Sequence, residues 1–172
     1  DLTVVIPALN EEENLELLLP SLRKVLKRVL SNSGLDYEII LVDGVSSSKP
    51  SPVAAQNDIR VVSQVKPGYG NALLCGFDAA RGEYILTMDA DLSHEPGFVE
   101  HLWEARHAAD VSIASRYVMG GQSDTHWLRM LLSKILNRWF AFGLSLPVTD
   151  LSSGFRLYRT RVLRTLGLDC HD

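Results

Sequence analysis

Residues 2–30 read LTVVIPALNEEENLELLLPSLRKVLKRVL, a short apolar run followed by a longer mixed segment. The run Leu2–Pro7 is apolar and rich in β-branched side chains, which predicts a strand. From Glu11 to Leu30, leucines and valines recur every three or four residues, which predicts an amphipathic helix. The acidic start of this segment suits the positive end of a helix dipole. A strand followed by such a crossover helix indicates the first half of a β-α-β unit.

The same alternation continues along the chain. Strands are predicted over Glu38–Asp43, Ile59–Val65, Tyr84–Met88 and Val111–Ser115, and helices over Asn71–Ala80 and Gly97–Ala109. This order is typical of an α/β fold of the Rossmann-like kind, an open, mostly parallel twisted sheet with helices on both faces. At 172 residues we expect a single domain over 1–172, truncated at its C-terminus because the chain stops just after a helical pattern.

Composition excludes several classes of protein. The chain is 46% hydrophobic and 22% charged, which is typical of a globular protein. A net charge of −4 argues against a nucleic-acid partner, and no apolar run approaches the ~20 residues that span a bilayer. Cys75 and Cys170 show no metal-binding spacing and no disulfide framework, so we expect a reducing, cytoplasmic location.

Acidic residues follow three of the predicted strands. Ligands of open α/β sheets bind beyond the carboxyl ends of the strands, where Glu11, Asp43 and the pair Asp89 and Asp91 are expected. In an extended segment, side chains two residues apart point to the same side. Paired carboxylates of this kind hold Mg²⁺ or Mn²⁺ together with substrate phosphates. An isolated Asp-x-Asp is more often a helix cap and a solvated charge, but its place after an apolar strand favours a metal site.

Two further features suit anions. The turn Lys66–Asn71 contains two glycines and opens a helix, which brings backbone N–H groups and a lysine together; a turn that merely needs positive φ is the alternative. Arg116 follows the fifth predicted strand, and Arg156 ends the run Asp150–Arg156. Arginines there suit phosphate recognition, with surface ion pairing as the alternative.

The segment Trp127–Leu146 has two contrasting stripes. The apolar one comprises Leu128, Leu131, Leu132, Ile135, Leu136, Trp139 and Phe140, and the polar one Arg129, Ser133, Asn137 and Arg138. Packing onto the domain core is the more frequent outcome of such a pattern. A position at a membrane interface is the alternative, because the segment also carries tryptophans and cations.

Taken together, these motifs resemble the family 2 glycosyltransferases of the GT-A fold, and within them the polyprenyl-phosphate sugar synthases typified by dolichyl-phosphate mannosyltransferase. Residues 5–11 (VIPALNE) resemble the nucleotide-binding opening of that family, and residues 89–96 (DADLSHEP) its metal motif. Ser115-Arg116-Tyr117 with Gly120-Gly121 is similar to its acceptor-phosphate segment. The family usually carries Asp-Asp-Gly-Ser after the second strand, where this chain has Asp43-Gly44-Val45-Ser46, and often a Gln at the position of Ser93.

The resemblance implies a role for each matching residue. Those expected to bind the donor are Pro7, Leu9, Glu11, Asp43, Lys66, Asp89 and Asp91. Asp89 and Asp91 are also expected to hold the metal, Mg²⁺ or Mn²⁺. Arg116, Arg129 and Ser133 are expected to hold the acceptor phosphate and, with Asp91, to form the catalytic set.

The expected activity is metal-dependent, inverting transfer of a sugar, here mannose from GDP-mannose, to a polyprenyl or dolichyl monophosphate. A lipid phosphate is already anionic at pH 7, so cations that hold it in line replace a general base. We expect the protein at the cytosolic face of a membrane, as a peripheral partner of its surface.

Two alternatives stay open at this point. One is a related transferase that uses another sugar nucleotide, such as UDP-glucose, on a prenyl phosphate or a glycan hydroxyl, with Asp150 as the nearest candidate base. The other is a non-catalytic sugar-nucleotide-binding domain. A sugar-1-phosphate nucleotidyltransferase would carry a basic, glycine-rich loop after the first strand, and Pro7–Glu11 is neither basic nor glycine-rich.

Overall fold

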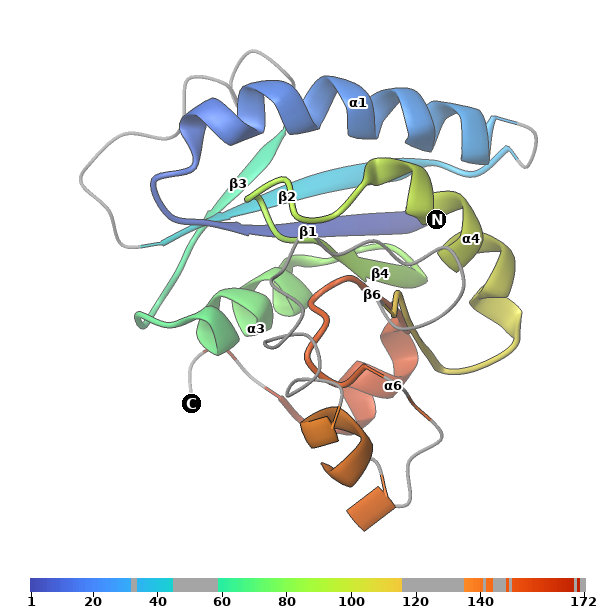
Figure 1. Ribbon diagram of the computed structural model, residues 1–172. Helices are drawn as coiled ribbons and strands as arrows, with labels where there is room; N and C mark the ends of the chain where they lie inside the picture. Colours follow the sequence, from blue (N-terminus) through green and yellow to red (C-terminus); the bar gives the residue numbers. More distant parts are fainter. Residues whose placement is uncertain are drawn as a thin grey trace.

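The computed structural model describes residues 1–31, 34–44, 59–115, 135–140, 142–143, 148, 150–168 and 170. Within these residues one sheet has the strand order β3-β2-β1-β4-β6-β5 (Figure 1). Its strands are β1 (Leu2–Ala8), β2 (Tyr37–Asp43), β3 (Arg60–Ser63), β4 (Tyr84–Thr87), β5 (Val111–Ile113) and β6 (Arg156–Arg159). The helices are α1 (Glu12–Leu30), α3 (Tyr69–Ala79), α4 (Val99–Glu104) and α6 (Thr160–Thr165). The predicted fold class is confirmed.

The strands β1 to β5 are the five that the sequence predicts, and all of them run in one direction. β1 pairs in parallel with β2 and β4, and β2 pairs in parallel with β3. The prediction missed β6, which lies between β4 and β5 and runs antiparallel to both. Its sequence, Arg-Leu-Tyr-Arg, has only Leu157 fully buried, so four residues carry too little apolar signal to predict a strand.

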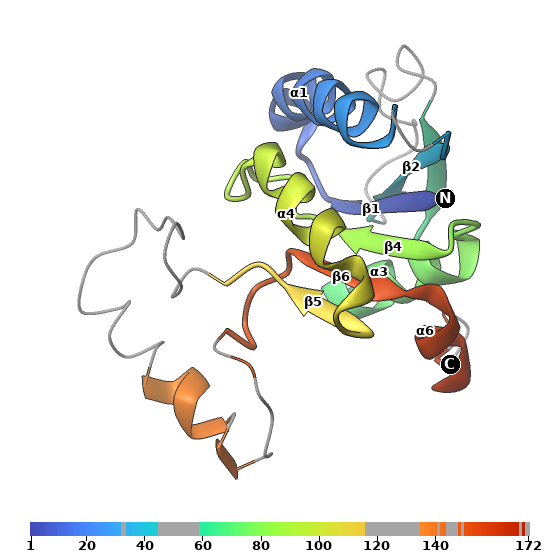
Figure 2. The same cartoon turned by 90° about the vertical axis from the view of Figure 1, so that its right-hand side faces the viewer.

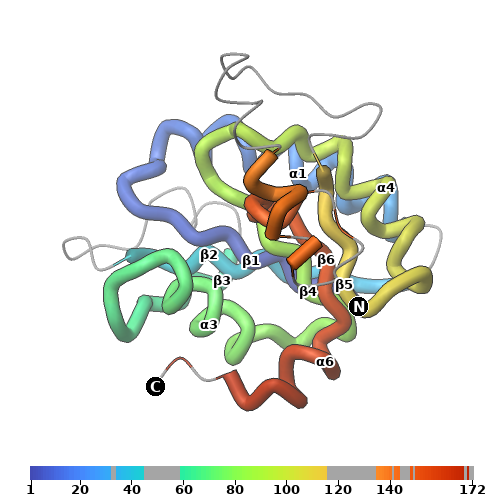
Figure 3. The backbone as a smooth tube through the Cα atoms, turned by 60° about the horizontal axis from the view of Figure 1, so that its bottom comes forward, coloured from blue at the N-terminus to red at the C-terminus, as the bar shows by residue number. Residues whose placement is uncertain are grey.

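Helices cover both faces of the sheet (Figures 2 and 3). On one face, leucines of α1 such as Leu19 and Leu22 pack with α4 and with alternate residues of β1 such as Val4. On the other face, Val5 of β1 packs with α3 and α6. Successive side chains of a strand point to opposite faces, so one strand contributes to both cores. The predicted helix over Gly97–Ala109 is shorter, because α4 is flanked by single 3₁₀ turns at Pro96–Phe98 and Ala105–His107.

The helical residues 135–140 lie apart from the sheet, in orange in Figure 2. The expectation that the apolar stripe of this segment packs onto the core is wrong for its described part. Ile135, Leu136, Trp139 and Phe140 are exposed, and Phe142 is 86% exposed. The polar Asn137 is buried instead, and its amide oxygen accepts a hydrogen bond from the main-chain N–H of Leu151 at 2.8 Å. No helix within the described ranges is long and apolar enough to cross a bilayer.

Candidate functional site

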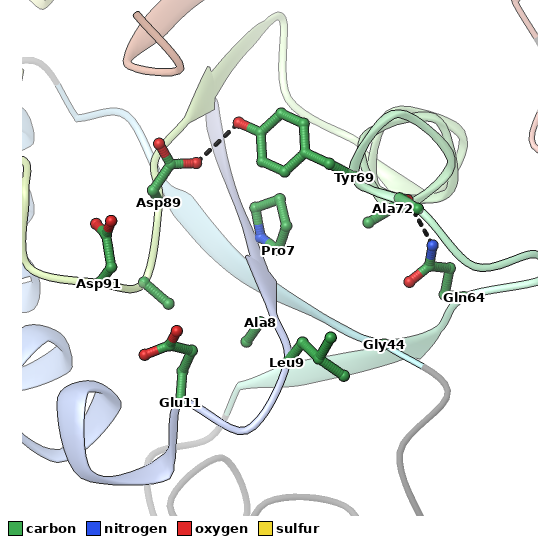
Figure 4. Close-up of a pocket in the computed structure, with 12 residues that line it drawn as sticks. Pro7, Ala8, Leu9, Glu11, Gly44, Gln64, Tyr69, Ala72, Asp89 and Asp91 are labelled. Atoms are coloured by element: carbon green, nitrogen blue, oxygen red, sulfur yellow. Dashed lines mark hydrogen bonds between the residues drawn. The ribbon is translucent and has the colours of Figure 1, made fainter.

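A pocket of about 470 Å³ opens at the carboxyl ends of the neighbouring strands β1, β2 and β4 (Figure 4). It is lined by Pro7, Ala8, Leu9, Glu11, Gly44, Gln64, Gly68, Tyr69, Ala72, Asp89, Ala90 and Asp91. These residues come from the end of β1, from the segments that follow β1, β2, β3 and β4, and from the first turn of α3. The pocket therefore lies where an open α/β sheet usually binds its ligand.

Carboxylates occupy one side of this pocket. Figure 4 shows Glu11, Asp89 and Asp91 together, across from Tyr69 and Gln64. Burial raises the pKa of Asp91. Hydrogen bonds from Ser93 and the electrostatic effect of the nearby His94 outweigh burial, so the pKa lies below its ordinary value. The main-chain N–H of Ser93 supplies one of these bonds, 3.0 Å from Oδ1. Asp91 is therefore ionised at neutral pH.

Asp89 is held from two sides. The Tyr69 hydroxyl donates a hydrogen bond of 2.8 Å to Asp89 Oδ1. The main-chain N–H of Asp89 donates to Nδ1 of His94 at 3.3 Å, and the His94 ring stacks on Phe155 with 5.0 Å between ring centroids. Burial and the hydrogen bond to Asp89 raise the pKa of Tyr69 above its ordinary value. The phenol therefore stays protonated and can donate this hydrogen bond.

The opposite end of the pocket is lined by Leu9, Gly44 and Gln64. Leu9 is 57% exposed, and a Cβ at position 44 would lie only 3.0 Å from Leu9 Cδ1. The Gln64 side chain donates to the main-chain oxygen of Gly68 at 2.6 Å and so fixes the turn before α3. Gly68 has φ 120°, which only glycine adopts easily, so this turn needs a positive φ. Gly68 also lines the pocket.

Five of the seven predicted donor-binding residues line the pocket: Pro7, Leu9, Glu11, Asp89 and Asp91. The other two, Asp43 and Lys66, do not line it. Asp43 ends β2 beside Ala8, where burial and then the carboxylate of Glu12 raise its pKa. Lys66 lies on the exposed turn before α3, where its main-chain N–H donates to Asn71.

The predicted acceptor residues Arg116, Arg129 and Ser133 lie outside the described residues. Of the candidates downstream, Asp150 is 1% exposed and accepts hydrogen bonds from Ser152, and it does not line the pocket. That position does not suit the general base considered for a glycan-forming enzyme.

Arg156 was a candidate for phosphate recognition. Its guanidinium instead donates to the main-chain oxygens of Leu151 and Ser153, and so it holds the turn before β6.

The carboxylates of this pocket fit a divalent cation that also binds a phosphate group. No group of three or more His, Cys, Asp or Glu side chains in the described ranges is placed to hold a metal alone. Asp89 and Asp91 nevertheless line one pocket, and one or two carboxylates plus substrate phosphates are the usual ligands of Mg²⁺. A cation held here would gain its remaining ligands from a bound phosphate compound.

Sequence reasoning missed two neighbours of Asp89: Tyr69, which donates to its carboxylate, and Gly154, where a Cβ would lie 2.7 Å from Asp89 Oδ2. Tyr69 stood in the turn singled out as a possible anion site, but nothing in the sequence pattern connects it with Asp89, twenty positions away. Gly154 stood in the run that precedes β6, a strand that the sequence did not reveal.

The sequence profile described as Glycosyl transferase family 2 matches residues 3–167. Among curated proteins, the chain is 34% identical to a dolichol-phosphate mannosyltransferase of Pyrococcus furiosus, over 97% of this chain and 48% of the relative. It is 35% identical to a polyprenol monophosphomannose synthase of Mycolicibacterium smegmatis, over 98% and 65%. An undecaprenyl-phosphate mannosyltransferase of Micrococcus luteus is 33% identical, over 96% and 69%. The chain thus spans about half to two thirds of these relatives.

Solved structures of glucosyl-3-phosphoglycerate synthase from Mycobacterium tuberculosis share the fold. The complex with UDP aligns with a TM-score of 0.69 at 24% identity, covering 94% of this chain and 57% of that one. The complex with Mn²⁺, UDP and phosphoglyceric acid aligns with a TM-score of 0.66 at 26% identity, covering 94% and 56%.

Proposed function

The chain belongs to glycosyl transferase family 2, and we propose that it carries the catalytic domain of an enzyme that transfers a sugar from a nucleotide sugar to a polyprenyl phosphate. The observation that carries this proposal is the pocket at the ends of β1, β2 and β4, where Asp89 and Asp91 face the same space as Pro7 and Leu9. The three named curated relatives act on lipid phosphates according to their names, which supports the acceptor class.

The donor is proposed to lie along this pocket. In this proposal Pro7 and Leu9 contact the nucleoside, and Asp43 lies beside Ala8 at the end of β2. The diphosphate faces Asp89 and Asp91. When bound, a Mg²⁺ or Mn²⁺ ion held by these two carboxylates neutralises charge on the leaving nucleoside diphosphate. Lys66, on the turn before α3, and the first N–H groups of α3, which begins at the pocket residue Tyr69, are proposed to assist the diphosphate.

The acceptor phosphate is proposed to be held by Arg116, Arg129 and Ser133. Their task is to align an anionic phosphate oxygen with the anomeric carbon, which then loses the nucleoside diphosphate in one displacement. One displacement inverts the anomeric centre. No side chain has to remove a proton, which agrees with the buried position of Asp150 away from the pocket.

We propose GDP-mannose as the donor, since two of the named relatives are mannosyltransferases and the third is a polyprenol monophosphomannose synthase. UDP-glucose is the second candidate, because a solved relative at 25% identity was crystallised with Mn²⁺ and UDP-glucose. Thermal unfolding with GDP or UDP, each with and without Mn²⁺, separates the two, because a ligand that binds the native state raises its stability. A higher unfolding temperature with GDP and Mn²⁺ supports GDP-mannose as the donor. A higher unfolding temperature with UDP but not with GDP favours UDP-glucose instead. No shift with either nucleotide would contradict the proposal that this pocket binds a nucleotide sugar.

We also propose that the protein acts at the cytosolic surface of a membrane. The exposed apolar side chains at Ile135, Leu136, Trp139, Phe140 and Phe142 support this, because they form a partly helical segment apart from the sheet. Tryptophan and phenylalanine on such a segment favour the boundary between lipid headgroups and chains.

The acceptor assignment is tested with Arg129→Ala, with Arg138→Ala as the control variant. Transfer of mannose to polyprenyl phosphate should be abolished in the first variant and retained in the second. Stabilisation by GDP and Mn²⁺ should remain in both, because Arg129 is assigned to the acceptor alone. Full transfer activity in Arg129→Ala would remove this residue from the acceptor site.

A further inference from the structure

Asp89 is enclosed by residues from two distant segments of the chain. Tyr69, the first residue of α3, donates to Asp89 Oδ1 at 2.8 Å. Figure 4 shows this bond as a dashed line between the two side chains. From the other segment, Gly154 approaches so closely that a Cβ there would lie 2.7 Å from Asp89 Oδ2 and 2.7 Å from the Tyr69 hydroxyl. Only a residue without a side chain fits against this pair.

Both neighbours of Asp89 are themselves fixed. The Thr87 hydroxyl donates to the main-chain oxygen of Gly154 at 2.6 Å, which ties that glycine to the end of β4. Tyr69 follows Gly68, whose carbonyl accepts the buried Gln64 side chain. The contact between Tyr69 and Asp89 therefore joins two anchored elements, although the Tyr69 side chain itself is half exposed.

We propose that Tyr69 is a positioning residue for the metal carboxylate, and that Gly154 provides the space in which Tyr69 and Asp89 meet. This inference rests on the proposed metal site at Asp89 and Asp91. The Tyr69 hydroxyl fixes the rotamer of Asp89, so that the carboxylate faces the pocket before the cation and the donor arrive.

The hydrogen bond leaves room for a cation. A carboxylate offers about four lone-pair positions on its two oxygens, and the phenol occupies one of them. Metal-binding carboxylates are commonly held by hydrogen bonds from neighbouring groups, and loss of such a partner lowers metal affinity by ~10- to 100-fold. Tyr69 is therefore expected to aid metal binding rather than to compete with it.

Tyr69→Phe tests the proposal, because it removes the hydroxyl and keeps the ring. Mn²⁺ binding to the 172-residue chain is measured by electron paramagnetic resonance in the presence of GDP and separately UDP. We expect the Mn²⁺ dissociation constant to rise by ~10-fold or more, with little change in the unfolding midpoint without metal. The control Tyr37→Phe changes a tyrosine at the start of β2, the opposite end of the strand from the site, and should bind Mn²⁺ like wild type.

Gly154→Ala provides a second variant, since its Cβ would push Tyr69 and Asp89 apart, and it should weaken Mn²⁺ binding as well. Its control is Gly97→Ala, whose Cβ would meet nothing closer than 3.5 Å. Normal Mn²⁺ binding by Tyr69→Phe, alongside a wild type that binds the metal, overturns the positioning role alone. A wild type that binds no Mn²⁺ with either nucleotide overturns the proposed metal site and the positioning role together.

Discussion

The side-chain amide of Asn137 and the main chain of Leu151 form a hydrogen bond of 2.8 Å between the exposed apolar segment and the turn before β6. Asn137 also donates to the Ser152 hydroxyl at 3.3 Å. A buried amide that satisfies a main-chain donor fixes the direction in which its helix faces. With Asn137 turned inward, its neighbours Leu136 and Trp139 point to solvent.

Asn137→Ala should therefore destabilise the turn. The Leu151 N–H loses its acceptor, and an unsatisfied buried donor costs about 1–3 kcal/mol of unfolding free energy. Chemical denaturation of the variant checks this value. The exposed neighbour variant Arg138→Ala serves as control and should unfold like wild type. Equal stability of both variants would show that the turn does not depend on Asn137.

Trp139→Ser combined with Phe142→Ser should weaken binding to lipid vesicles. Burial of each aromatic side chain contributes about 1.5–3 kcal/mol, so loss of both should lower the partition coefficient by about a hundredfold or more. Sedimentation with vesicles of phosphatidylcholine and phosphatidylglycerol measures it. Leu17→Ser is the control, since Leu17 is 67% exposed on α1, away from this segment. Unchanged sedimentation of the double variant would contradict the proposed membrane contact.

Asp91→Asn should abolish the stabilisation that GDP and Mn²⁺ give together, because the amide cannot supply the negative charge of the carboxylate. The pKa of Asp91 lies below its ordinary value, so in wild type this charge persists until the pH falls below the ordinary range of an aspartate. Metal binding by wild type should accordingly not titrate with Asp91 between pH 5 and pH 8. Thermal unfolding across this range checks both statements, and full stabilisation of Asp91→Asn would remove the residue from the metal site.

Asp43→Asn should raise stability and weaken donor binding. The pKa of Asp43 is raised in the folded protein by burial and by Glu12, so its ionised form is favoured in the unfolded chain. Folding stability is then lost as the pH rises through the ordinary pKa of an aspartate toward the raised value, and the loss is complete at neutral pH. The amide removes this cost. A higher unfolding midpoint at pH 7 together with weaker GDP binding is expected, and a lower midpoint would contradict the sign of the effect.

Much of the fold could be predicted from the sequence, because the first five strands alternate with helices of strong apolar periodicity such as α1. The resemblance to family 2 glycosyltransferases is confirmed over residues 3–167. Strand β6 escaped prediction because its four residues carry little apolar signal, and its pairing with β4 and β5 becomes evident only in the folded sheet.

The site residues that directly follow strands, such as Glu11, Asp89 and Asp91, could be predicted from the sequence. The contact of Tyr69 with Asp89 was not, because it depends on the packing of α3 beside β1 and on the space at Gly154. The orientation of the segment around Asn137 also differs from the pattern, since the polar Asn137 is buried there and the apolar stripe is exposed.

The most direct test of the proposed function is transfer of radiolabelled mannose from GDP-mannose to a polyprenyl phosphate, with Mn²⁺ and with a saccharide acceptor in parallel. We expect label in an organic-soluble lipid from which mild acid releases free mannose, and no label in this lipid when Mn²⁺ is removed by a chelator. Label on the saccharide hydroxyl, with none in the lipid phosphate, would contradict it.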